Sequence, residues 1–93
     1  MKLIWSGAAI ADRHAIVDFI AADSPKAAIA MDLELADRTD ALKIHPMIGR
    51  PGRLPQSREL VLIGTPYLII YRILETHIQI LRVLHAAQPW PPK

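Results

Sequence analysis

The spacing of apolar residues in this chain changes its period at one segment, IHPMIGRPGRLPQS (residues 44–57), which holds three prolines and two glycines. Proline and glycine at this density interrupt both helices and strands, so the segment is predicted to be a loop. Before it, apolar residues recur every three or four positions, as on one face of a helix. After it come short runs rich in Ile, Val, Leu and Tyr, which are typical of strands. The loop therefore separates a helical half from a β half.

Two helices are predicted in the first half, after a short strand at residues 2–5. The first spans residues 6–23, where Ser6 can cap the free amides of the first turn. The second spans residues 24–43, with Ser24 in the same capping position and a proline directly after it. The join between them is so short that the two helices are expected to form an antiparallel hairpin.

Three strands are predicted in the second half, at residues 58–64, 67–75 and 77–85. Their joins are only one or two residues long, and short joins between strands require antiparallel pairing, so the three strands should form a meander. The element order is therefore β-α-α-β-β-β. We predict a single α+β domain over residues 1–93, in which the helical hairpin packs on one face of an antiparallel sheet.

Composition excludes several classes of function. The chain is 52% hydrophobic and 22% charged, which is ordinary for a folded domain, and it contains no cysteine. The four histidines show no metal-ligand spacing, so neither a metal site nor a cofactor is expected. Glu59 and Glu75 lie on separate predicted strands and give no acid–base pair. The absence of cysteine fits a cytoplasmic protein. The longest uncharged stretch, residues 60–71, contains Gly and Pro and is too short for a membrane span.

Charge is distributed unevenly along the chain. Residues 1–40 carry four Lys/Arg and seven Asp/Glu, a net charge of −3, whereas residues 41–93 carry seven Lys/Arg and two Asp/Glu, a net charge of +5. A basic half indicates an acidic partner, which could be nucleic acid, the ribosome or an acidic protein segment. A merely solubilising surface is the other interpretation, and charge alone does not decide between them.

Arg82 and His85 are the residue types that an RNA-cleaving enzyme uses, one to hold a phosphate and one to move a proton. Side chains three positions apart on a straight strand point to opposite faces, so the pair could act together only if a bulge preceded His85. The same alternation predicts that Arg82 shares a face with Ile78, Ile80 and Leu84. We therefore interpret the pair as binding or folding residues and expect no catalytic residues.

Other basic residues lie around the loop. Arg50, Arg53 and Arg58 could clamp a phosphate or a carboxylate, since guanidinium groups match both anions, or they could pair with acidic residues of the helices. Trp90, in a proline-flanked tail, either folds back over the core or anchors a partner. The candidate binding residues are Arg50, Arg53, Arg58, Tyr67, Arg72, Arg82, His85 and Trp90.

Several short motifs occur together in the second half, namely GRPGR, SRELVL, PYLIIYRI and ILRVLHAAQPW. Because these motifs occur in this order, the chain resembles the RelE/ParE superfamily of toxins from bacterial type II toxin–antitoxin systems. Ala9, Asp12, Ile16 and Ile20 match a recurrent pattern in the first helix of that family, and the likeness covers nearly the whole chain. Arg13 departs from the pattern, because its position is usually apolar; its stem is expected to lie along the core edge with its guanidinium in water.

The resemblance implies one of two activities. RelE-like members cleave mRNA in the ribosomal A site, whereas ParE-like members bind and poison DNA gyrase. RelE-like members commonly have an arginine after the aromatic residue of the middle strand, where Leu68 follows Tyr67 here, and basic residues where this chain has Ala at 86–87. RELV, PYLIIYR and VLHAAQPW look more like the ParE-like branch and its plasmid-stabilisation relatives, so gyrase inhibition is expected. In the alternative, a ribosome-dependent mRNA endonuclease, Arg82 and His85 would be catalytic.

The resemblance also implies partners. A cognate antitoxin of the ParD type is expected to lay a helix and an extended segment along the apolar groove and basic face of the toxin. DNA gyrase is the expected target, and no sequence-specific DNA binding is expected from the toxin alone. A third possibility is a degenerate member that still binds its antitoxin and no longer inhibits growth.

Overall fold

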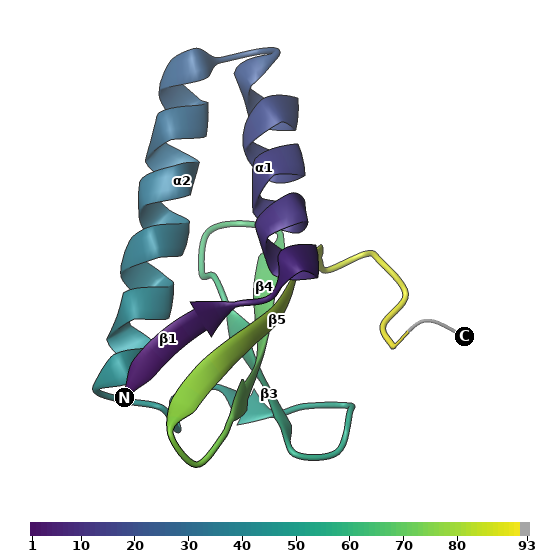
Figure 1. Cartoon of the computed structure of the whole chain (residues 1–93). Helices are drawn as coiled ribbons and strands as arrows, with labels where there is room; N and C mark the ends of the chain where they lie inside the picture. Colours follow the sequence, from purple (N-terminus) through teal and green to yellow (C-terminus); the bar gives the residue numbers. More distant parts are fainter. Residues whose placement is uncertain (92–93) are drawn as a thin grey trace.

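A hairpin of two helices covers one face of a five-stranded sheet (Figure 1). The computed structural model describes residues 1–91. The helices are α1 (Gly7–Ala21) and α2 (Pro25–Asp40), and a 3-10 turn, η1 (Ala41–Lys43), continues the second. The strands in chain order are β1 (Lys2–Trp5), β2 (Arg50–Pro51), β3 (Ser57–Val61), β4 (Tyr67–Ile73) and β5 (His77–His85). The predicted α+β fold is confirmed.

The sheet has the order β1-β5-β4-β3-β2 and is mixed rather than wholly antiparallel. β3, β4 and β5 form the predicted antiparallel meander. β1 pairs in parallel with β5, from Lys2 opposite His77 to Trp5 opposite Ile80. A parallel pair requires a long crossover, and all the elements between β1 and β5 supply it. The predicted loop also contains β2, whose two residues pair with β3.

Both helices begin at the predicted serine caps. The Ser6 hydroxyl accepts a hydrogen bond from the Ala9 amide at 3.0 Å, and the Ser24 hydroxyl accepts one from the Ala27 amide at 3.1 Å. Each bond satisfies an amide that has no partner inside its helix. Ser6 also donates to the carbonyl of Leu81 at 2.9 Å, which fixes the start of α1 against β5.

The main core lies between the helices and the sheet. Ala9, Leu35 and Leu42 contribute to it from the helical layer, and all three are fully buried. The sheet contributes buried residues from β4 and β5 and from the turn after β3, namely Leu62, Tyr67, Ile69, Tyr71, Ile78, Ile80 and Val83. Within residues 1–91, neither helix has the length and apolar content needed to cross a membrane.

A β-bulge at Leu81 reverses the alternation of side chains in β5. The register with β4 shifts there, so Ile70 pairs with Arg82 and Leu81 has no partner. Ile78 and Ile80 face the helices, whereas Arg82 faces the opposite side of the sheet, which we call the open face. The expectation that Arg82 shares a face with Ile78 and Ile80 is therefore wrong, because the bulge inserts one residue between them.

The open face carries a small apolar cluster of its own. Leu68, Ile70 and Leu84 are buried there, and Leu81 and Trp90 pack against them. Of the two roles considered for Trp90, the structure thus shows the fold-back, although onto the open face and not onto the main core.

Candidate binding face of the sheet

Four arginines converge on the open face from different elements. Arg50 lies on β2, Arg72 on β4 and Arg82 on β5, and Arg53 reaches the face from the loop between β2 and β3. The sheet register places three of them, because Arg50 is opposite Glu59, Arg72 is opposite Ser57 and Arg82 is opposite Ile70. Cross-strand partners point to the same side of a sheet, so guanidinium groups far apart in sequence share one surface.

A buried carboxylate, Glu59, organises two of these arginines. Its side chain is 2% exposed, and it accepts hydrogen bonds from Arg50 Nη2 at 3.1 Å and from Arg53 Nε and Nη2 at 3.1 and 3.2 Å. The Arg53 backbone amide donates a further bond at 3.0 Å. Burial by itself raises the pKa of the Glu59 carboxyl, but these hydrogen bonds outweigh it, so the pKa lies below its ordinary value. The bond to Glu59 in turn raises the pKa of Arg53.

Glu59→Gln is expected to destabilise the fold by about 2 kcal/mol at neutral pH, because charge-assisted hydrogen bonds are lost and an amide N–H then faces guanidinium donors. The folded pKa of Glu59 is lowered, so its stabilisation is complete above the unfolded value of about 4.3 and is lost as the pH falls through the folded pKa. Urea unfolding of both proteins between pH 7 and 3 should show the difference shrinking at acidic pH. If the difference in the free energy of unfolding stayed constant over that range, Glu59 would not be an ionised partner of the two arginines.

Asp12 on α1 holds Arg82. The Arg82 guanidinium donates from Nε to Asp12 Oδ2 at 2.7 Å and from Nη2 to Oδ1 at 3.0 Å. Asp12 Oδ2 also accepts the Val83 backbone amide at 3.0 Å. β1 ends at Trp5, which pairs with Ile80 directly before the bulge in β5. The Val83 amide lies beyond the end of β1, so a side chain has to accept its hydrogen bond. The hydrogen bond that Arg82 donates to Asp12 raises the pKa of Arg82, which stays fully charged.

Arg72 is held far less tightly than the other three arginines. The only hydrogen bond of its side chain within residues 1–91 runs from Nη2 to the Pro55 carbonyl at 3.4 Å. Its Nε is buried without a partner, and no carboxylate of the described chain lies within ion-pair distance. Arg72 therefore has donor groups and positive charge to offer to an anion.

The remaining candidate residues lie elsewhere. Arg58 faces the helical side and donates to the carbonyls of Met47 and Gly49, so it holds the loop before β2. Tyr67 and His85 are cross-strand partners on the helical side, with ring centroids 5.7 Å apart and planes at 89°. The structure thus brings together Arg50, Arg53, Arg72, Arg82 and Trp90, and sets apart Arg58, Tyr67 and His85.

Arg82 and His85 point to opposite faces, as the alternation along a strand predicts. Arg82 is paired with Ile70 on the open face, and His85 is paired with Tyr67 on the helical side. The bulge lies at Leu81, before Arg82, and does not bring the two side chains together. The two residues therefore do not converge on one phosphate in this structure.

Asp12 and Glu59 are site residues that the sequence pattern does not identify. Glu59 has a local signal, because a carboxylate in the middle of the apolar run SRELVL must be paired if it is buried. Its partners could not be named without knowing that β2 exists. Asp12 meets Arg82 across 70 positions of sequence, and no local spacing predicts that contact.

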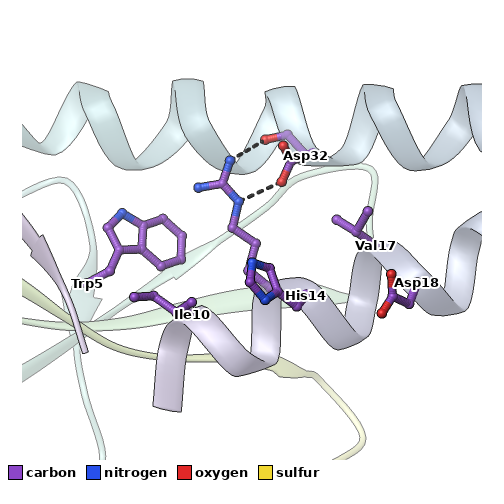
Figure 2. A pocket seen from close by; sticks show the side chains of 7 residues that line it. Trp5, Ile10, His14, Val17, Asp18 and Asp32 are labelled. Carbon is purple, nitrogen blue, oxygen red and sulfur yellow. Dashed lines mark hydrogen bonds and ion pairs between the residues drawn. The ribbon is translucent and has the colours of Figure 1, made fainter. Parts of the chain in front are cut away.

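A separate hollow of about 680 Å³ lies between α1 and α2, next to Trp5 at the end of β1 (Figure 2). Arg13 Nε donates to Asp32 Oδ1 on α2 at 2.6 Å, and the guanidinium lies 5.0 Å from the centre of the Trp5 ring. The expectation that the Arg13 guanidinium lies in water holds only in part, because the group is also paired with Asp32 and covered by Trp5. The Arg13 side chain is 25% exposed because an ion pair and a cation–π contact take the place of water.

Known proteins match this chain in sequence along almost its whole length. Residues 3–90 match the family model described as the ParE toxin of the type II toxin–antitoxin system parDE. "Putative toxin Y4kP" of Sinorhizobium fredii is 40% identical over 90 residues, covering 97% of this chain and 93% of the relative. "Toxin RelE2" of Caulobacter vibrioides is 38% identical over 87 residues, covering 94% and 97%.

A solved structure gives the same result at the level of the fold. A chain of the chromosomal ParDE toxin–antitoxin system from P. aeruginosa superposes with a TM-score of 0.82 at 30% identity, covering 91% of this chain and 95% of that one. The family match spans the helical hairpin, the meander and Trp90 alike. The chain therefore belongs to the ParE family of type II toxin–antitoxin toxins, within the RelE/ParE superfamily.

Proposed function

We propose that this protein is the toxin of a toxin–antitoxin pair, that its antitoxin covers the open face, and that DNA gyrase is its target. The observation that carries the proposal is the convergence of four guanidinium groups on the open face of a ParE-family chain. Glu59 and Asp12 are the carboxylates that pair with them, so the face keeps a positive balance. A surface of this kind favours an acidic protein segment as its partner.

The way Arg82 is held supports binding rather than chemistry. Asp12 already takes two guanidinium N–H groups of Arg82, and His85 is turned to the other face. RNA cleavage by this pair would require a proton-transfer group and a phosphate-holding group on the same side of the sheet. Arg82 is better suited to present a fixed positive charge to a protein surface.

An antitoxin partner is supported by the relatives. The solved relative comes from a ParDE toxin–antitoxin system, and the family description names parDE. We expect the antitoxin encoded beside this chain to co-elute with it, and the affinity to fall as salt is raised from 0.05 to 0.5 M, because exposed charges are screened at high ionic strength. Separate elution of the two proteins at low salt would contradict the antitoxin assignment.

One observation favours a second candidate function. A relative that covers nearly the whole chain carries the name RelE2, and RelE-like activity would be ribosome-dependent mRNA cleavage. This candidate predicts that Arg82→Ala or His85→Ala abolishes cleavage on stalled ribosomes. The matched control is Lys26→Ala, which removes a positive charge from the exposed start of α2.

The deciding experiment is supercoiling of relaxed plasmid by purified gyrase with increasing amounts of this protein. The gyrase proposal expects inhibition together with linearised plasmid, and reversal of both when the antitoxin is added. No effect at concentrations well above those that stop growth would exclude gyrase, and the ribosome assay would then follow. Induction of the chain in cells without growth arrest would indicate a member that is no longer toxic.

A further inference from the structure

The last described residues fold back across the open face. Trp90 packs on the cluster of Leu68, Ile70 and Leu84, and the three cluster residues are buried. The segment from Ala86 to Pro91, which we call the strap, has no strand or helix of its own. Backbone hydrogen bonds fix its start, from the Ala86 amide to the Pro66 carbonyl at 2.7 Å and from the Gln88 amide to the His85 carbonyl at 2.9 Å, and side-chain contacts of Trp90 hold its end.

Two arginines of the open face hold the strap. Arg53 Nη1 donates to the Trp90 carbonyl at 3.1 Å, and the Arg82 guanidinium lies 5.9 Å from the centre of the indole ring. Glu59 and Asp12 position these arginines from the other side. The patch under Trp90 is thus an apolar floor with guanidinium groups at its edge, and it accepts a large aromatic side chain next to a carbonyl oxygen.

The strap leaves polar groups around this patch without partners among residues 1–91. The Trp90 indole Nε1 is buried and has no hydrogen-bond partner among residues 1–91, which is unfavourable for a buried donor. The buried Nε of Arg72 is likewise without a partner on the same face. A carboxylate would satisfy guanidinium donors better than the single carbonyl that the strap offers to Arg53. The contacts therefore favour an occupant that pairs an aromatic ring with acidic groups.

We propose that the patch of Leu68, Ile70 and Leu84 is the docking site for an aromatic side chain of an acidic antitoxin segment, and that Trp90 occupies the patch in the free chain. The inference rests on the proposed function, because it takes the antitoxin as the partner. Trp90 is then a competitor of the partner and not an anchor for it. Binding requires the strap to open. The apparent affinity is therefore the affinity of the open form multiplied by the fraction of molecules in which the strap is open.

The test uses Trp5→Phe as the background, in which Trp90 is the sole tryptophan. Two fluorescein-labelled peptides serve as probes, Asp-Glu-Phe-Asp-Glu and the matched Asp-Glu-Ala-Asp-Glu, and binding is followed by anisotropy. Minor open states are commonly populated at roughly 0.1–10%, so Trp90→Ala should tighten binding of the Phe peptide by about 10-fold or more. Binding of the Ala peptide, which does not use the patch, should change by less than about 3-fold.

A second variant loosens the strap without removing Trp90. The Gln88 side chain accepts the His85 amide at 2.7 Å and so fixes the turn into the strap, and Gln88→Ala should give a smaller tightening for the Phe peptide. Trp90 emission should also shift to longer wavelength when the Phe peptide binds, because the indole moves into water. Circular dichroism checks that both variants are folded.

Equal or weaker binding of the Phe peptide by Trp90→Ala would overturn the inference and make Trp90 an anchor. An unchanged Trp90 emission on saturation would overturn it as well. Neither result depends on gyrase or on the antitoxin itself. Failure of the antitoxin to bind the unmodified chain would instead count against the proposed function, so the two failures are distinguishable.

Discussion

Gly49→Ala is expected to lower the free energy of unfolding by about 3 kcal/mol, because overpacking a closed site forces neighbouring atoms to move. A β-carbon at this position would lie 2.5 Å from Tyr71 Oη and 2.6 Å from Tyr71 Cε1. The ring cannot swing aside, since it is fully buried and its hydroxyl donates to the Pro46 carbonyl at 2.7 Å. The same hydroxyl accepts the Gly49 amide at 2.8 Å, so that bond is lost too. Burial raises the pKa of the Tyr71 phenol, which keeps the hydroxyl protonated for this role.

Thermal unfolding followed by circular dichroism measures this effect. A loss of about 3 kcal/mol corresponds to a fall in Tm of roughly 12 to 24 °C for a domain of this size. Gly7→Ala is the matched control, because no atom lies within 4 Å of its added β-carbon and alanine favours the helix there. A Gly49→Ala protein that melts within 3 °C of the parent would show that the loop before β2 can move away from Tyr71 at little cost.

Arg72→Glu is expected to weaken antitoxin binding by about 100-fold, because a like charge placed against an acidic partner costs several kcal/mol. Within the described part of the chain the Arg72 side chain has one long hydrogen bond and no carboxylate partner, so its charge can act on a ligand. For the same reason, the fold should change in stability by less than about 1 kcal/mol. Titration calorimetry at low salt measures the affinity, and urea unfolding measures the stability.

Lys26→Glu is the control for net charge, since it changes the total by the same amount on the exposed start of α2. Its effect on antitoxin affinity should be under about 3-fold, because a rim or distant charge acts weakly through solvent. Equal losses for the two variants would mean that the antitoxin responds to overall charge and not to the open face. An unaffected Arg72→Glu protein would remove Arg72 from the binding surface.

Local chemistry made the helices predictable. Ser6 and Ser24 each cap a helix as expected, because the cap requires only residues within one turn. The predicted boundaries were long by a few residues at the ends. The second helix becomes a 3-10 turn after Asp40, and β3 ends at Val61 because the chain turns at Gly64, whose φ is +86°. Positive φ is a conformation that glycine adopts without strain.

Long-range features of the binding face could not be predicted in the same way. The bulge at Leu81 depends on how β5 aligns with β4, and HIQILRVLH fits either register because apolar residues occupy both faces. The contact between Asp12 and Arg82 depends in turn on that bulge and on where β1 ends. The basic residues of the candidate face were identifiable from charge alone, whereas the carboxylates that position them required the three-dimensional register.

The parallel pairing of β1 with β5 has a consequence for how the molecule is made. Among the described elements β1 is synthesised first and its partner strand, β5, last, so the sheet stays unfinished until β5 has been synthesised. The Asp12–Arg82 contact closes over the same long span. Contacts between distant parts of a sequence also form slowly, because a large loop must close first. A truncated chain that lacks β5 therefore has neither the completed sheet nor Arg82, and a complete binding face exists only after β5 has been translated.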